Sequence, residues 1–350
     1  MPTLKIEVLI SSGKFMLDKG ELRKKLLQAE GFDDKVLQTV YDAKWQQIWV
    51  PKEYGGLGYS FSEGLKVLEH VSEIDGSLGW FVTLCSGANY FSRNLKPEIA
   101  QKLFKQPDIC FGGSGMLGGN AEKIGDSYLI NGLWNYATGA PYLTHFTLNA
   151  QIVKNGIPLV DNEGQPEFRS FILDAPQVKL IPSWKSMGMV ATASHSFTVE
   201  NQYVPQENSF IYNSFFTSDP LNHIPFGIFA DLTLLVNYLG MANHFLECSF
   251  MIKTETIQGA FKEYLNKASQ KMHDYATKVE GCLSEKIAPD EVLVSEIHAF
   301  GEEVVESLTL YITGLYRLLG IKASVLNEEI NQIFRDFFTA TQHSNFRREA

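Results

Sequence analysis

The stretch NGLWNYATGAPYLTHFTLNA, residues 131–150, begins like a turn and ends like a buried strand. Its middle residues, Tyr136, Ala137, Thr138 and Gly139, include small and hydroxyl-bearing side chains where a packed strand should carry bulky ones. A strand that gives up packing at one point often does so because a ligand or a second backbone lies against it. The stretch therefore predicts a contact surface inside a β region.

The sequence on either side of this stretch has two different periodicities. Between residues 107 and 205, short runs such as SYLINGLW, HFTLNAQIV, FRSFILDA and SFTVENQYV are separated by Gly, Pro and Asn, which is typical of strands. Before this region, apolar residues recur at helical spacing over 36–45 and again over 65–74, and Ser62 is the expected N-cap of the second helix.

After residue 225 the chain is again helical in pattern. Four segments are expected, near residues 226–252, 260–285, 290–322 and 326–343, and each carries one apolar face. The predicted fold class is therefore α+β. It consists of an N-terminal helical domain, a middle β domain and a C-terminal four-helix bundle, at residues 1–106, 107–222 and 223–350.

The composition excludes several classes of partner. The chain has 350 residues, 45% of them apolar, and 30 basic against 40 acidic side chains give a net charge of −10. This balance argues against nucleic acid or an anionic membrane surface as a partner. Four separated cysteines without a C-x-x-C pair are typical of reduced thiols, and residues 1–10 lack the features of a signal peptide. We therefore expect a cytoplasmic protein.

The most apolar stretch, residues 224–252, is long enough to span a bilayer. Asp231, Asn237, Asn243, His244 and Glu247 interrupt it, so we expect a buried helix of a soluble bundle. His244 and Glu247 lie three positions apart, as in carboxylate-bridged metal sites. A single pair of this kind is typical of an internally hydrogen-bonded core pair, and no metal is predicted.

Residues 113–118, GSGMLG, match the G-x-G-x-x-G pattern of dinucleotide-binding turns. A polar turn into another strand follows them, where the dinucleotide-binding fold requires a helix. We therefore expect a flexible glycine loop between strands. Its bare backbone amides keep it as a candidate ligand loop.

Three motifs in order resemble one known family. WVPKEYGGLGYS at 49–60, NGLWNYATGA at 131–140 and WKSMGMVATASHSFTVENQYVP at 184–205, followed by a helical C-terminal region, resemble the acyl-CoA dehydrogenase superfamily. The resemblance implies two helical domains around a β domain. It also implies a flavin, FAD or FMN, held between the β domain and the C-terminal bundle.

The resemblance further implies which residues hold the flavin. Tyr136, Ala137 and Thr138 would lie along the isoalloxazine ring, with the Thr138 hydroxyl and backbone near its reactive nitrogen N5. A flat ring needs small residues and a close backbone, which would explain the gap in the strand. Further parts of the cofactor would contact Gly113, Ser114, Gly115, Trp184, Thr192 and Ser194.

The segment RDFFTATQH, residues 335–343, resembles the flavin-dependent monooxygenase branch of the same superfamily, in which an Arg-Asp pair and a histidine recur on the last helix. Members of that branch take reduced flavin from a partner reductase and, with oxygen, oxygenate a small aromatic or heteroatom substrate. His343 would then act on the substrate near neutral pH. Without the resemblance, His343 reads as a surface histidine, and Arg335 and Asp336 read as a helix-surface pair.

Two other functions stay open. An acyl-CoA dehydrogenase needs a carboxylate base, and Asp231 is the nearest acid to one of the two positions that the family uses. A flavin-free scaffold or acyl-binding module is the third reading. By resemblance we also expect a homotetramer built as a dimer of dimers.

Overall fold

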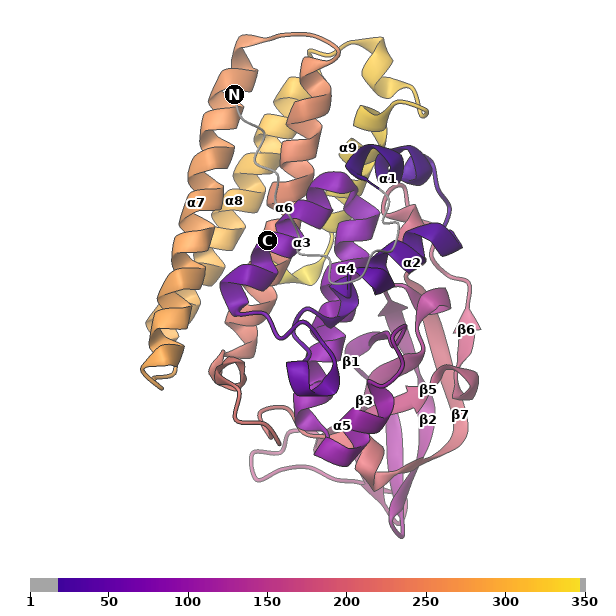
Figure 1. Ribbon diagram of the computed structural model, residues 1–350. Coiled ribbons are helices and arrows are strands. Elements are labelled where there is room, and N and C mark those ends of the chain that lie inside the picture. The colour runs from indigo at the N-terminus through magenta and orange to yellow at the C-terminus, as the bar shows by residue number, and fades with distance from the viewer. Residues whose placement is uncertain (1–17, 347–350) are drawn as a thin grey trace.

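Residues 18–346 are described by the computed structural model, and their elements follow the order expected from the sequence (Figure 1). The expectation about residues 1–10 lies outside the described part. Five helices come first and form the N-terminal part of the molecule. They are α1 (Lys19–Leu26), α2 (Asp34–Asp42), α3 (Phe61–Ile74), α4 (Gly76–Asn89) and α5 (Pro97–Leu103).

The middle part is one mixed sheet of eight strands in the order β6-β7-β2-β1-β3-β5-β8, with β4 paired to β3. β1 and β3 run parallel, and the other paired strands are antiparallel. The strands are β1 (Phe111–Ile124), β2 (Ser127–Ala137), β3 (His145–Lys154), β4 (Ile157–Pro158), β5 (Phe168–Asp174), β6 (Lys179–Ile181), β7 (His195–Pro205) and β8 (Ser209–Phe210).

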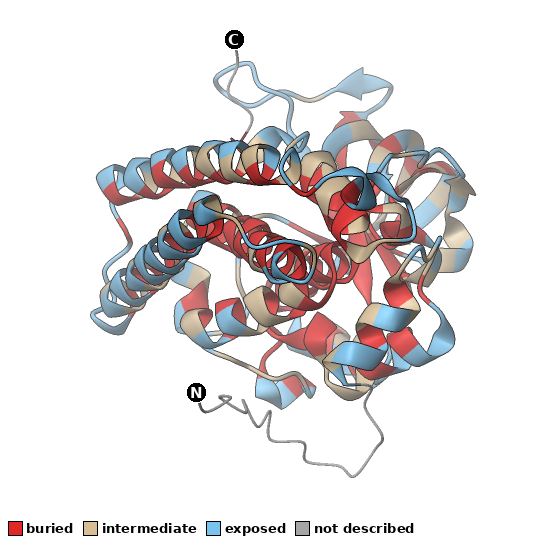
Figure 2. Cartoon of the chain, turned by 90° about the horizontal axis from the view of Figure 1, so that it is seen from above, coloured by how far each residue is buried: buried red, intermediate tan, exposed pale blue. Residues whose placement is uncertain are grey.

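The last part consists of α6 (Phe226–Phe250), α7 (Thr256–Ser284), α8 (Glu291–Tyr316) and α9 (Glu329–Ala340). Helix α6 lies at the centre and packs against α3, α7, α8 and α9. Figure 2 shows the outer faces of α7 and α8 exposed and their inner faces buried. Helix α6 is long and apolar enough to cross a membrane, yet 78% of its most apolar window is buried inside the protein.

The three-part α+β architecture predicted from the sequence is confirmed, while two local predictions were wrong. The N-cap of α3 is Ser60, whose capping box with Glu63 satisfies the first turn of the helix. Ser62 lies inside the first turn, where its hydroxyl donates to Glu280 of α7.

The glycine stretch 113–118 is part of strand β1 and not a loop. A Cβ at Gly113 would lie 1.8 Å from the carbonyl oxygen of Thr147 on the parallel strand β3, so this position needs glycine for a close approach. The register between β1 and β3 shifts at Ser114/Leu117 and again at Leu117/Gly119. The strand is therefore bulged at the predicted ligand segment.

Helix α4 joins the β domain to the C-terminal helices. Most of its residues are buried, and it packs against β1, α6, α9 and the 3-10 turn Val190–Thr192 (Figure 1). Its N-cap is Asp75, which is also the C-cap of α3. Side chains from one helix therefore reach both the β domain and the end of the chain.

Candidate active site

Three predicted site residues form a continuous chain of hydroxyl groups. Thr138 Oγ1 lies 3.1 Å from Ser194 Oγ, and Ser194 Oγ lies 2.8 Å from Thr192 Oγ1. Thr192 Oγ1 donates at 2.7 Å to the carbonyl oxygen of Met189. The Gly139 amide also donates to the Thr192 carbonyl at 2.7 Å, so the end of β2 is held against the turn before β7.

The carbonyl at the end of this chain fixes the direction of its hydrogen bonds. A carbonyl oxygen only accepts, so the single hydroxyl hydrogen of Thr192 is used on Met189. Ser194 must then donate to Thr192, and Thr138 must donate to Ser194. The lone pairs of Thr138 Oγ1 remain, and this end of the chain acts as an acceptor.

Two aromatic side chains lie beside the hydroxyl chain. The rings of Tyr136 and Trp184 meet edge to face with centroids 5.7 Å apart, and Tyr136 is 57% exposed. Trp184 Nε1 donates at 2.9 Å to the carbonyl of Met189, which also accepts the hydrogen bond from Thr192 Oγ1. The indole is thus oriented by the same peptide that orders the hydroxyls.

The bulged part of β1 lies next to this edge. Ser114 Oγ donates at 2.7 Å to the Asn135 carbonyl, which directly precedes Tyr136. A Cβ at Gly115 would meet no atom within 4 Å, and the following Met116 and Leu117 are exposed. An open backbone position with exposed apolar neighbours fits the requirements of a flat, largely apolar ring.

Two predicted contacts lie behind this surface. Ala137 and Thr192 have no exposed area, so in this conformation they support the surface formed by Thr138, Tyr136 and Trp184 without touching a ligand. From α4, the Cys85 thiol lies 4.0 Å from the Thr138 carbonyl. Burial raises the pKa of Cys85 well above its ordinary value, which keeps the thiol neutral there.

The last predicted catalytic residue, His343, lies on the other side of α4. Its ring meets the Trp80 ring edge to face with centroids 5.5 Å apart, and its Nδ1 accepts from the Asn345 amide at 3.3 Å. Desolvation of the ring lowers the pKa of His343. The residue is exposed, and these two contacts orient its ring.

Asp231, the alternative base, is held by other groups. Its carboxylate accepts from Asn345 Nδ2 at 2.7 Å and lies 3.2 Å from His298 Nδ1. Burial raises the pKa of Asp231, although both partners oppose this. Within residues 18–346, its hydrogen-bond partners are His298 and Asn345 and do not include Thr138, Thr192 or Ser194.

Asp336 is the site residue whose environment the sequence did not predict. The surface-pair reading is wrong for it, because only 2% of its area is exposed. Its Oδ1 accepts from the Met189 amide at 2.5 Å, and its Oδ2 is buried without a hydrogen-bond partner among residues 18–346. Burial first, and then the nearby Asp75 carboxylate, raise the pKa of Asp336 to about 8. The helical spacing could have predicted its burial, since Asp336 shares a helix face with Ile333, Phe337 and Ala340.

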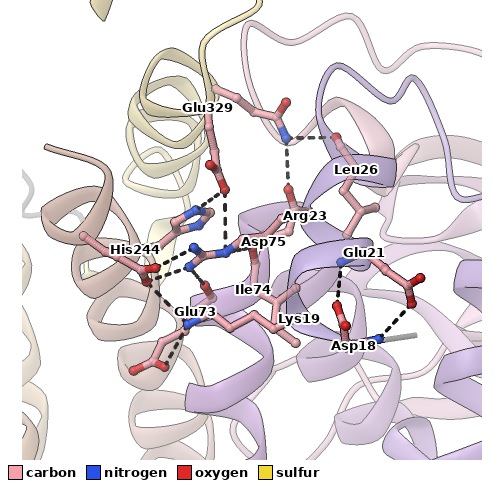
Figure 3. A network of polar contacts seen from close by, with 12 residues as sticks. Asp18, Lys19, Glu21, Arg23, Leu26, Glu73, Ile74, Asp75, His244 and Glu329 are labelled. Atoms are coloured by element: carbon pink, nitrogen blue, oxygen red, sulfur yellow. Dashed lines mark hydrogen bonds and ion pairs between the residues drawn. The ribbon is translucent and has the colours of Figure 1, made fainter. Parts of the chain in front are cut away.

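A polar network joins α1, α3, α6 and α9 (Figure 3). The Arg23 guanidinium makes two 3.0 Å contacts with Glu247, donates at 2.6 Å to the Glu73 carbonyl, and lies 3.6 Å from Glu329. A cavity of about 10 Å³ separates this network from Asp336. That space holds at most about one water molecule.

One group in this network has the residue types of a metal site. Ligand atoms of His244, Cys248 and Glu329 all lie within 4.8 Å of one another. His244 Nε2 is already 2.7 Å from Glu329, and the cationic Arg23 lies beside the same carboxylate. A guanidinium in that position competes with a divalent ion for the carboxylate. The absence of a metal stays a prediction.

Comparison with known proteins agrees with the resemblance read from the three motifs. Residues 15–106 match the family model described as the acyl-CoA dehydrogenase N-terminal domain. Indole-3-acetate monooxygenase of Pseudomonas putida is 29% identical over 199 residues, which are 57% of this chain and 49% of that protein. The chain therefore spans about half the length of this curated relative in the alignment.

Solved structures match over nearly the whole chain. The HsaA monooxygenase of M. tuberculosis has a TM-score of 0.84 at 17% identity, over 93% of this chain and 92% of that one. XiaF from Streptomyces sp., in complex with FADH2 and glycerol, has a TM-score of 0.83 at 17% identity, over 94% and 89%. TdsC from Paenibacillus sp. A11-2, with FMN and indole, has a TM-score of 0.77 at 19% identity, over 93% and 91%.

These matches define the class of the protein by its fold. Residues 15–106 are similar to the acyl-CoA dehydrogenase N-terminal domain, and the three parts of the chain share the fold of the solved structures named above. Within that fold, the three solved structures named above include two that carry a flavin, and the first is named as a monooxygenase.

Proposed function

We propose that the protein is a flavin-dependent oxidoreductase of the monooxygenase type, which uses reduced flavin and oxygen on a small aromatic or heteroatom substrate. The relatives named as monooxygenases support this reading, as do the FADH2 and FMN complexes among the structures of the same fold. FAD and FMN both fit the proposal, since the residues above concern the ring that the two share.

The observation that carries the proposal is the direction of the hydroxyl chain. Thr138 Oγ1 is left as an acceptor because its hydrogen is used on Ser194. Two-electron reduction adds N–H donors to the flavin ring, while the oxidised ring presents acceptors at the same edge. A wall that accepts hydrogen bonds therefore suits reduced flavin, which is the form that a two-component oxygenase receives.

Bound flavin would supply the activation of oxygen, and the chain's own residues would do the rest. Thr138 and Ser194 orient the ring edge, while Tyr136 and Trp184 cover its apolar surface. His343, with its pKa lowered by desolvation, is neutral at pH 7 and can take a proton from the substrate. The exposed Met116 and Leu117 extend the apolar surface next to the ring.

The two alternatives have less support. Desaturation of an acyl thioester requires a free carboxylate beside the ring, and Asp231 is instead engaged by Asn345 and His298. A flavin-free scaffold or acyl-binding module would leave the ordered hydroxyl chain and the bulge in β1 without a role.

The proposal extends to partners and location. A flavin reductase would deliver the reduced cofactor, and the chain would act in the cytoplasm as a homotetramer built as a dimer of dimers. No nucleic acid, membrane or metal takes part in it. The net charge of −10 supports the first two of these exclusions.

Stopped-flow mixing of the anaerobically reduced, flavin-loaded protein with oxygen tests the proposal. We expect a transient absorbing species, distinct from both reduced and oxidised flavin, before the oxidised spectrum returns. The reaction is repeated with indole present, as one small aromatic probe. Direct, featureless reoxidation under both conditions, together with flavin reduction by an acyl-CoA, would favour the dehydrogenase. Failure to retain either flavin in either redox state would favour the scaffold.

A further inference from the structure

The segment from Trp184 to Ser194, which carries half of the proposed flavin wall, is docked on the last helix. Arg335 Nη1 donates at 2.5 Å to the Met187 carbonyl, and the Met189 amide donates at 2.5 Å to Asp336. The Gly188 backbone packs so closely that a Cβ there would lie 2.2 Å from the Arg335 carbonyl oxygen. Three successive residues of the segment thus meet α9.

The backbone of this segment needs such a support. Met189 and Ala193 have φ angles of 55° and 42°, in the left-handed region that side-chain-bearing residues rarely adopt. Conformations of this kind persist only where their surroundings fix them. Met189 is fixed on both sides of its backbone, because its N–H binds Asp336 and its carbonyl receives Thr192 and Trp184.

We infer that Asp336 is a positioning residue, which acts through the Met189 backbone to hold residues 184–194 in the conformation that binds the flavin. Its carboxyl holds the Met189 peptide in place. The carbonyl of Met189 then sets the direction of each hydrogen bond from Thr192 to Thr138. The identity of the ligand rests on the proposed function, whereas the positioning rests on contacts within this chain.

The surroundings of Asp336 explain which part of the side chain is required. Oδ1 makes the bond to Met189, and in the described part of the chain Oδ2 has no hydrogen-bond partner. Asparagine keeps an oxygen acceptor at the same distance from the backbone, whereas alanine removes it. Asp336→Asn should therefore preserve the positioning, and Asp336→Ala should abolish it.

Two readouts test the inference on the full chain with FMN or FAD as the probe. The first is hydrogen exchange of the amides in residues 184–194, measured without flavin. The second is the dissociation constant of reduced flavin. We expect Asp336→Ala to speed exchange in the segment by about tenfold or more and to raise the dissociation constant by roughly tenfold. We expect Asp336→Asn to match the wild type in both.

Gly188→Ala disturbs the same contact from the other side and covers the case in which Asp336→Ala fails to fold. The matched control is Glu69→Ala, because Glu69 joins α3 to α7 through Ser269 and His273 at 2.8 and 2.7 Å, away from the wall. We expect Gly188→Ala to behave like Asp336→Ala, and Glu69→Ala to leave both readouts unchanged.

The outcomes separate the inference from the proposed function. Unchanged exchange in Asp336→Ala or, if that variant does not fold, in Gly188→Ala overturns the positioning role. Faster exchange with unchanged flavin affinity overturns the link between the segment and the cofactor. Equal defects in Asp336→Asn and Asp336→Ala would overturn the assignment to Oδ1. If the wild type binds no flavin, the proposed function fails, and the exchange measurement still decides the positioning.

Discussion

The rings of Trp80 and His343 meet edge to face, with centroids 5.5 Å apart and an interplanar angle of 70°. Trp80 is on α4, the same helix whose Cys85 touches the Thr138 carbonyl. Two different sides of one helix therefore contact His343 and the hydroxyl chain in the β domain. Substitution of either side should affect a different step.

His343→Ala should lower substrate oxygenation by about 10²- to 10⁴-fold, the range of a lost general acid or base. Flavin affinity should not change, because His343 contacts Trp80 and not the hydroxyl chain. Product formation and flavin titration measure the two effects. The matched control is Gln342→Ala, an exposed neighbour. Wild-type turnover in His343→Ala would remove this residue from the mechanism.

The pH dependence of the same step follows from the lowered pKa of His343. A lowered pKa means that the imidazole stays neutral to a pH below the ordinary value of about 6.5. Oxygenation should therefore be constant around neutral pH and fall only under more acidic conditions. A rate that rises on acidification from pH 7 would contradict a role for the neutral form.

Thr192→Val should change the preference of the site for reduced over oxidised flavin, although Thr192 has no exposed area. Without the Thr192 hydroxyl, Ser194 and Thr138 are no longer forced to donate away from the ligand. Oxidised flavin should then bind more tightly relative to reduced flavin, by about tenfold for one hydrogen bond. Thr192→Ser keeps the hydroxyl and is the control. The same ratio of dissociation constants in all three proteins would refute the proposed direction of the chain.

Arg23→Ala should destabilise the protein by about 1–3 kcal/mol, because it leaves the part-buried carbonyls of Glu73 and Ile74 without their donor. Lys19→Ala is the matched comparison, since Lys19 also pairs with Glu247 but is 37% exposed against 12% for Arg23 (Figure 3). An exposed pair contributes less than about 1 kcal/mol. Chemical denaturation measures both, and equal losses would show that burial of Arg23 is not the cause.

Asp336→Asn should alter how stability depends on pH. In the folded protein the pKa of Asp336 is raised to about 8, against 3.8 ordinarily, by burial and then by Asp75, while Arg335 opposes the shift. Between these values the folded state keeps a proton that the unfolded chain has lost, so this carboxyl contributes less stability as pH rises. Arg23, His244 and Glu329 also line the cavity beside Asp336. The substitution leaves these three residues unchanged, so the comparison isolates the titration of Asp336.

The stability of Asp336→Asn relative to wild type should therefore increase between about pH 5 and about pH 9. Denaturation curves at the two pH values give the comparison. Parallel changes in the two proteins would mean that Asp336 does not titrate in this range.

Features that depend on neighbouring residues were predictable from the sequence. Helical spacing located α3 and α6 to α9, and short runs separated by Gly, Pro and Asn located β2, β3, β5 and β7, because each pattern lies within its own segment. The N-cap of α3 was misplaced by two residues because Ser60 and Ser62 are both suitable types. The reciprocal bond of Glu63 decides between them.

Features that depend on distant partners were not predictable. Gly113 reads as loop in sequence, and only the approach of Thr147 shows why a strand needs glycine there. Asp336 and Met189 are 147 positions apart, so nothing near either residue indicates that they meet. The flavin contacts themselves came from resemblance to a family, and they stay predictions.

The separation of Met189 and Asp336 has a consequence for biosynthesis. At about 5–20 residues per second, a ribosome needs roughly 7–30 s to pass from one residue to the other. During that interval the β domain can pair its strands, while the segment before β7 lacks its contacts with Arg335 and Asp336 of α9. The nascent protein thus completes the proposed flavin-binding segment only after α9 has emerged, and we expect an unfinished chain to bind flavin poorly.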